Sequence, residues 1–186
     1  MKYTIPLVGV LALAGWCGAE ETVELGDELV VNGGLEGEYK EHPVYSHPAA
    51  WRGNIFGQAQ GRYLPETENP HSGRSAIKIE CDALPTGGIS FYQTDRVIQF
   101  VPGRKYILSA WIRSDTDADN VYMGIRDCEQ LTKIITATRG WRKYTIEKTY
   151  TGAPGSDFVA LFYFATRPGN VVIDDNGDVP VITVVD

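Results

Sequence analysis

Residues 105–113 read KYILSAWIR, and their side-chain pattern is the clearest indication of the fold class. Its side chains alternate between two faces with the period of two that is typical of a β-strand. One face carries Tyr106, Leu108, Ala110 and Ile112, and the other carries Ile107, Ser109, Trp111 and Arg113. Residues 120–126 (NVYMGIR) repeat the pattern, with Val121, Met123 and Ile125 opposing Tyr122, Gly124 and Arg126. Both stretches therefore predict half-buried strands.

Segments of the same kind recur along the chain, rich in Val, Ile, Tyr, Phe and Thr and separated by Gly, Pro, Asn and Asp. We expect strands at 22–31, 75–81, 89–101, 105–113, 120–126, 132–138, 142–150, 157–165, 171–174 and 181–185. Residues 36–69 are expected to form a long loop. No window shows sustained helical periodicity. The pattern predicts an all-β sandwich of two antiparallel sheets.

Composition limits the possible functions of the 186-residue chain. Its 17 Lys and Arg against 24 Asp and Glu give a net charge of −7, which argues against nucleic-acid binding through a basic face. Residues 1–19 combine Lys2, an apolar run and small residues up to Ala19, as a secretory signal peptide does. We therefore expect a secreted monomer with one domain at 20–186 and no transmembrane segment. Trp16 argues against a lipid anchor on Cys17, which is the alternative.

Two cysteines, Cys81 and Cys128, remain after removal of such a signal. In an oxidising compartment they form either one disulfide or two separate buried thiols, and the sequence leaves both open. Catalytic motifs are missing: there is no nucleophile elbow, no HExxH and no phosphate-binding glycine loop. A non-enzyme is therefore expected. A small secreted glycosidase stays the alternative, because 24 acids leave room for a carboxylate pair.

Five motifs occur in a characteristic order: residues 32–36 (NGGLE), 71–77 (HSGRSAI) and 101–109 (VPGRKYILS), then Trp141, then 172–175 (VIDD). In that order they resemble the carbohydrate-binding modules of families 4, 9 and 22. The resemblance implies a jelly-roll fold and a partner that is a polysaccharide or oligosaccharide. Trp141 is expected to pack the sandwich. A secreted structural or protein-interaction module without a glycan site is the alternative.

The resemblance also implies a structural Ca²⁺ held near the two ends of the domain. Carried over by position, its ligands are the Gly34 carbonyl, Glu36, oxygens of Ser72 and Ser75, and Asp174. Calcium accepts such a mixture of hard oxygen ligands. Ser72 departs from family members that have an acid there. The alternative is that Glu36 and Asp174 are solvated acids at strand ends.

The sugar-binding groove that the resemblance implies lies on the concave sheet, where aromatic rings stack on sugars. Strand parity assigns to it Trp111, Arg113, Tyr122 and Arg126, and Trp51 from a loop and Tyr92 from an adjacent strand are expected to join them. The register around residue 92 leaves open whether Phe91 or Tyr92 is the exposed ring. An aromatic residue on an outer strand face is also a common packing partner. His42 and His47, each followed by Pro, are interpreted as part of an extended loop and not as metal ligands.

Overall fold

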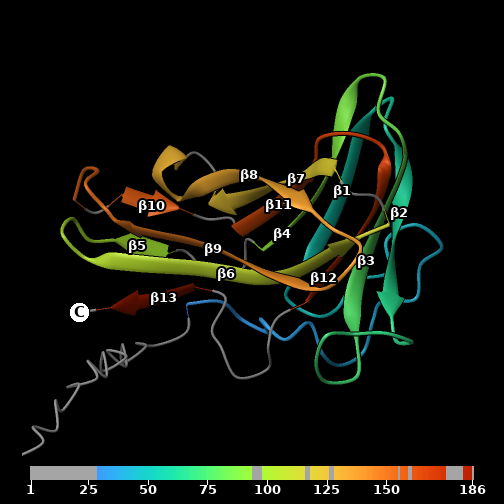
Figure 1. Cartoon of the computed structure of the whole chain (residues 1–186), viewed down its shortest axis with the longest axis horizontal. Coiled ribbons are helices and arrows are strands. Elements are labelled where there is room, and N and C mark those ends of the chain that lie inside the picture. Colours follow the sequence, from blue (N-terminus) through green and yellow to red (C-terminus); the bar gives the residue numbers. More distant parts are fainter. Residues whose placement is uncertain are drawn as a thin grey trace, which may run out of the picture.

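The computed structural model describes residues 29–93, 98–115, 118–125, 128–154, 156–158, 161–174 and 182–185. These residues form two facing antiparallel sheets, which Figure 1 shows as two layers with β7, β8 and β11 lying over β6, β9 and β12. The all-β jelly-roll sandwich predicted from the sequence is confirmed. The proposed signal peptide, residues 1–19, lies outside the described residues.

The five-stranded sheet has the order β1 (Arg52–Gly57), β4 (Gly87–Gln93), β11 (Leu161–Ala165), β7 (Ala118–Ile125), β8 (Thr132–Ala137). The six-stranded sheet has the order β13 (Ile182–Val185), β6 (Lys105–Ser114), β12 (Gly169–Asp174), β3 (Ala76–Ala83), β2 (Gln60–Glu66), and β9 (Arg142–Thr149) also pairs with β6. Short strands β5 (Ile98–Phe100) and β10 (Ser156–Phe158) pair with each other, and a 3-10 turn η1 (Glu129–Leu131) precedes β8. Strands adjacent in sequence thus often lie in opposite sheets, as in β6 and β7.

Four of the expected elements differ from the structure. Residues 36–69 are not one loop, because β1 and β2 lie within them. The expected strand at 89–101 is two strands, β4 and β5, and the one at 157–165 is β10 and β11. Of the expected strand at 22–31, residues 22–28 lie outside the described residues. Residues 29–31 are not a strand: the side-chain amide of Gln93 bonds the N–H and C=O of Val31 at 2.9 and 2.6 Å.

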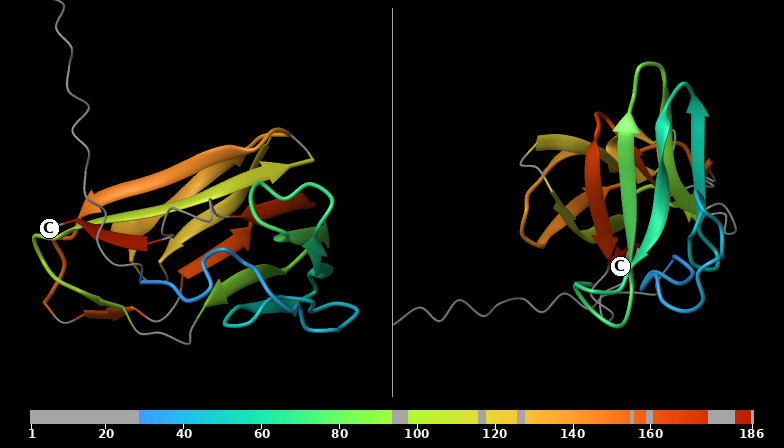
Figure 2. Two further views of the ribbon diagram at one scale, coloured as in Figure 1. Left: turned by 90° about the horizontal axis from the view of Figure 1, so that it is seen from below. Right: turned by 90° about the vertical axis from the view of Figure 1, so that its right-hand side faces the viewer.

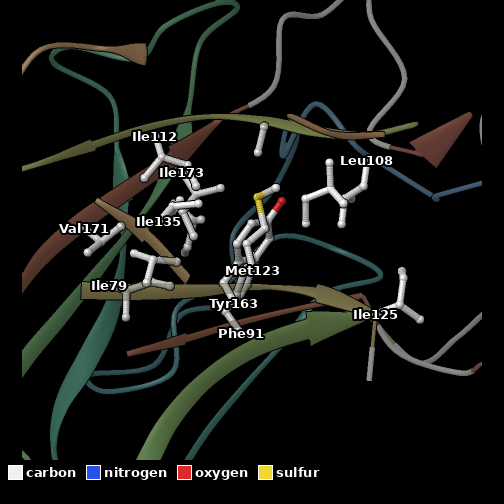
Figure 3. Close-up of a cluster of buried hydrophobic side chains, with 14 of the residues drawn as sticks. Ile79, Phe91, Leu108, Ile112, Met123, Ile125, Ile135, Tyr163, Val171 and Ile173 are labelled. Carbon is white, nitrogen blue, oxygen red and sulfur yellow. The ribbon is translucent and has the colours of Figure 1, made fainter. Parts of the chain in front are cut away.

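The core lies between the two sheets. Figure 3 shows inward side chains from the six-stranded sheet, such as Ile112 and Ile173, facing those from the five-stranded sheet, such as Phe91, Met123 and Tyr163. All five are at most 2% exposed. Burial of this apolar surface at about 25 cal/mol per Å² is the main force that holds the layers together.

Tyr63 of β2 joins the two sheets. Its ring is fully buried, and its hydroxyl group lies 2.9 Å from the carbonyl oxygen of Asn54 and 2.7 Å from that of Ser90, in β1 and β4. Burial raises the pKa of this hydroxyl far above its usual range. A Cβ at Gly53 would lie 2.5 Å from the Tyr63 ring, so the ring requires glycine there.

The thiols of Cys81 and Cys128 are both buried and both free. Of the two arrangements that the sequence allows, the structure therefore contains two separate thiols. Burial raises the pKa of each thiol above its usual value. The fold is complete without a bridge between these two residues.

Candidate functional site

Two carboxylates from opposite ends of the described chain hold the same short loop, residues 71–75. Asp174, at the end of β12, is 1% exposed, and its Oδ2 accepts the backbone N–H groups of His71 (2.8 Å) and Ser72 (3.0 Å). Oε1 of Glu36 accepts those of Arg74 (2.8 Å) and Ser75 (3.3 Å). The two acids that the sequence singled out thus bind the same loop, although 138 positions separate them in the sequence.

Glu36 is positioned by Asn32. The Asn32 side chain accepts the N–H of Glu36 at 3.1 Å and donates to its carbonyl oxygen at 3.0 Å. It also donates to the carbonyl of Ala49 at 3.1 Å. Asn32 and Leu35 have φ of 50° and 55°, the left-handed region that Asn tolerates better than most residues. This explains the NGGLE motif: Asn32 turns the chain and fixes the carboxylate that follows.

The groups beside these carboxylates are hard oxygens, which fit a calcium ion. Oγ of Ser75 lies 3.2 Å from the carbonyl oxygen of Leu35 and 3.4 Å from Oε2 of Glu36. The Tyr39 hydroxyl lies 3.0 Å from the same carbonyl. Burial raises the pKa of Tyr39 well above its usual range; Ser75 opposes the rise, and the charges of Asp174 and Glu36 add to it. Tyr39 therefore remains a neutral hydroxyl group beside both acids.

The predicted ligand set stays a prediction, and the structure adds the Leu35 carbonyl to the oxygens near Glu36. The backbone carbonyl beside Ser75 belongs to Leu35, one residue after Gly34. Ser72 approaches Asp174 through its N–H, which is a donor. Among the described residues, no group of three or more acids, histidines or cysteines is placed to hold a metal. A cation here would therefore depend on carbonyl and hydroxyl oxygens in addition to two carboxylates.

The outer face of the five-stranded sheet carries Tyr92 and Tyr122. Their neighbours in sequence, Phe91 and Met123, point into the core, so strand alternation places both tyrosines on the opposite face. The exposed ring is thus Tyr92 and not Phe91, which is fully buried. Both tyrosines are half-buried, and β11 lies between their strands. Ile134, which pairs with Tyr122, is 54% exposed and extends this apolar face.

A pocket of about 740 Å³ adjoins this face. Its floor is formed by Arg52, Asn54 and Tyr92 of β1 and β4, and its wall by the segment 38–50. In both views of Figure 2 the blue segment that begins at residue 29 lies beside β1 (cyan). The pocket and the tyrosine face are therefore continuous through Tyr92. The complete lining consists of Glu38, Tyr39, Lys40, His42, Tyr45, His47, Pro48, Ala49, Ala50, Trp51, Arg52, Gly53, Asn54 and Tyr92.

Trp51 was expected to line the sugar-binding groove, but its ring is buried, so this prediction is wrong. It is 3% exposed and stacks on Phe91, with ring centres 4.8 Å apart and planes inclined by 7°. Its Nε1–H donates to the carbonyl of Asn32 at 2.8 Å. The turn before it, with Ala50 at φ 67°, directs the ring inward just before β1 starts. Trp51 therefore packs the core beneath the pocket.

Trp111 and Arg113 lie on β6 in the six-stranded sheet, away from the tyrosine face. Trp111 stacks on His71, with ring centres 3.8 Å apart. The Arg113 guanidinium lies 5.2 Å from the centre of the Trp141 ring and donates to Glu66 at 2.7 Å. These contacts pack the loop after β2 onto the outer side of this sheet, and Trp141 takes part in them without belonging to the core between the sheets.

The prediction that all six residues share one groove is therefore wrong. The structure brings Tyr92 and Tyr122 to one sheet and places Trp111 and Arg113 on the other, with Trp51 in the core. Parity gives the face of a strand but not the sheet to which the strand belongs. Arg126 lies outside the described residues. Sequence reasoning missed the pocket-lining Arg52 and Asn54, because it placed them in a loop.

Comparison with known proteins supports the fold. No family model and no curated protein matches the chain. Among solved structures, it is similar to TmCBM61 in complex with β-1,4-galactotriose (TM-score 0.52, 15% identity, covering 86% of this chain and 98% of that one). It is also similar to a CBM4 structure (TM-score 0.53, 16% identity, 84% and 98%). These structures are jelly-roll carbohydrate-binding modules, and this chain has their fold.

A third similar structure is an arabinose-bound GH51 α-L-arabinofuranosidase, MgGH51 (TM-score 0.56, 14% identity). The match covers 87% of this chain but only 26% of the arabinofuranosidase, so this chain corresponds to about a quarter of that protein.

Within the part of the chain that the structure describes, no helix has the length and apolar character needed to cross a membrane.

Proposed function

We propose that this chain is a non-catalytic carbohydrate-binding module that binds a polysaccharide or oligosaccharide on the outer face of its five-stranded sheet. The observation that carries the proposal is the pair of half-buried rings Tyr92 and Tyr122 on the outer face of one sheet, with Tyr92 also lining a pocket of about 740 Å³. Phenol rings stack on the apolar faces of sugars, and Arg52 and Asn54 beside Tyr92 offer hydrogen bonds to hydroxyl groups. The fold shared with carbohydrate-binding modules supports the same function.

The expected affinity is moderate. If each stacked sugar removes on the order of 100 Å² of apolar area from water, the gain is roughly 2.5 kcal/mol per ring. Two rings give about 5 kcal/mol, while association costs roughly 4 kcal/mol or more. Hydrogen bonds to sugar hydroxyls each contribute only about 1 kcal/mol. The balance predicts dissociation constants between micromolar and millimolar, so that repeated sites along a polymer would be needed for firm retention.

Affinity electrophoresis against a panel of xylans, β-glucans, mannans and galactans tests this proposal. The full chain should be retarded by at least one polymer. Tyr92→Ala and Tyr122→Ala should each weaken binding by roughly 50-fold, the equivalent of one lost stack. Tyr144→Ala, on β9 of the other sheet, is the matched control and should bind normally. Retardation by no polymer would refute glycan binding and favour the structural or protein-interaction module.

We also propose that a structural Ca²⁺ binds between Glu36 and Asp174, with the Leu35 carbonyl and the Ser75 hydroxyl as further ligands. The ion would neutralise two carboxylates that lie beside the buried Tyr39 hydroxyl. A ligand at 100 times its dissociation constant stabilises the fold by about 2.7 kcal/mol. Urea unfolding with calcium and with chelator should show such a difference in the native chain and none in Glu36→Gln. The exposed neighbour variant Glu38→Gln should behave like the native chain.

Residues 1–19 are proposed to act as a secretory signal peptide, which would place the module outside the cytoplasm. Expression of the full chain with its natural start, followed by mass measurement of the exported product, tests this. A product beginning at Glu20 is expected. A product that keeps Met1 would contradict the proposal.

A further inference from the structure

The wall and floor of the pocket beside Tyr92 concentrate basic side chains. Lys40, His42, His47 and Arg52 all line it, whereas Glu38 is the acidic residue in the lining. The chain as a whole has a net charge of −7. With both histidines neutral, the lining carries +1, from Lys40 and Arg52 against Glu38. The pocket lining is therefore richer in basic groups than the chain as a whole, and this local excess favours an anionic ligand there.

The basic groups act on one another across this pocket. The pKa of His47 is lowered, mainly by burial and further by the neighbouring basic groups of Lys40, Arg52 and His42, while its contact with the carbonyl of Pro48 opposes the shift. A negative charge bound in the pocket would therefore offset the repulsion between these basic groups.

His42 faces the pocket as a neutral hydrogen-bond donor. Its Nδ1 accepts the backbone N–H groups of Val44 at 3.1 Å and of Tyr45 at 2.9 Å. The ring proton of the neutral imidazole must therefore be on Nε2. The pocket thus combines two permanent cations with an imidazole donor, beside a tyrosine ring of the sheet face. Donors and cations together suit a ligand that carries an anionic acceptor.

We propose that this pocket binds the anionic group of an acidic sugar residue, so that the preferred ligand is an acidic polysaccharide. The anionic group is either a uronate carboxylate or a sulfate ester, since both present several acceptor oxygens to Lys40 and Arg52. The volume of about 740 Å³ is large enough to admit a sugar residue together with its charged group. This inference rests on the proposed function, because the adjacent sugars of the same chain would lie on Tyr92 and Tyr122.

Matched polymers provide the test: glucuronoxylan against its carboxyl-reduced form, and a sulfated galactan against its desulfated form. The full chain should bind one acidic polymer more tightly than its neutral counterpart by about two- to fivefold, as one partly exposed ion pair allows. The polymer pair that shows the difference identifies the anionic group. The preference should shrink as salt is added, because screening weakens exposed charge pairs.

The variant Lys40→Gln, which changes a pocket cation that the proposed sugar stacking does not use, should reduce the preference and keep the weaker binding of the neutral polymer. The double variant Arg142→Gln and Lys143→Gln removes two exposed cations from β9 on the other sheet and should keep it. Equal binding of acidic and neutral polymers, abolished by Tyr92→Ala, would overturn this inference and leave the proposed function standing. Failure to bind any of the four polymers or the neutral panel would overturn both.

Discussion

Replacing Asn32 with Gly removes the side chain that fixes Glu36 while keeping the backbone conformation accessible. Glycine adopts φ of +50° without strain, so the variant tests the hydrogen bonds and not the turn itself. Three side-chain hydrogen bonds are lost: two with the backbone of Glu36 and one with the carbonyl of Ala49. The bond from Trp51 Nε1 ends on the Asn32 backbone carbonyl and should persist.

The size of the effect follows from those bonds. Each contributes about 1 kcal/mol net, and the glycine adds roughly 0.5–1 kcal/mol through the greater entropy of the unfolded chain. The free energy of unfolding should therefore fall by about 3.5–4 kcal/mol. Loss of the bonds to the Glu36 backbone also leaves the position of its carboxylate less fixed, so the proposed stabilisation by calcium should become smaller in this variant.

Urea unfolding followed by tryptophan fluorescence measures the change, since Trp51 is buried directly beneath Asn32. The control is Asn69→Gly in an exposed loop, where the backbone N–H and not the side chain makes the bond to Glu66. That control should lose less than about 1 kcal/mol. If Asn32→Gly is no less stable than Asn69→Gly, the account of how residues 32–36 hold the site is wrong.

Gly73→Ala should lower the free energy of unfolding by about 2 kcal/mol, because the added carbon would lie 1.9 Å from Oε1 of Glu36. The control Gly103→Ala also has a positive φ without that contact, so its free energy of unfolding should fall less in the same urea titration. Trp51→Ala should cost about 3–5 kcal/mol of unfolding free energy, and a loss under 1 kcal/mol would contradict its core position against Phe91. The lowered pKa of His47 means that the unfolded chain binds its proton more readily. The stability that depends on neutral His47 should therefore be complete above about pH 6.5 and decline at lower pH. Urea midpoints measured at several pH values should fall less in His47→Gln than in the native chain.

Strand alternation predicted the central strands well because their buried faces are strongly apolar. In β6, Tyr106, Leu108, Ala110 and Ile112 are all at most 2% exposed, as the sequence pattern indicated. The edge strands β1 and β2 were missed. They are rich in polar residues and glycine, and Pro65 lies within β2, which an edge strand tolerates and a central strand does not.

The candidate site was predictable in part. The sequence motifs predicted a shared site for Glu36 and Asp174, and in the structure both carboxylates accept backbone N–H groups of the loop at residues 71–75. The motifs could not assign Trp111 to a sheet, since strands that follow each other in a jelly roll often switch layers. The basic pocket depends on how the segment 38–50 folds over β1, which no periodicity in the sequence records.

The thiols of Cys81 and Cys128 provide internal reporters of breathing motions. One lies on β3 in the six-stranded layer, and the other lies just before η1, next to the end of β7 in the opposite layer. An alkylating reagent attacks only a thiolate that it can reach, so modification of either sulfur requires the surrounding structure to open. Mass spectrometry of digested samples after timed exposure would therefore reveal which layer opens first, without any engineered label.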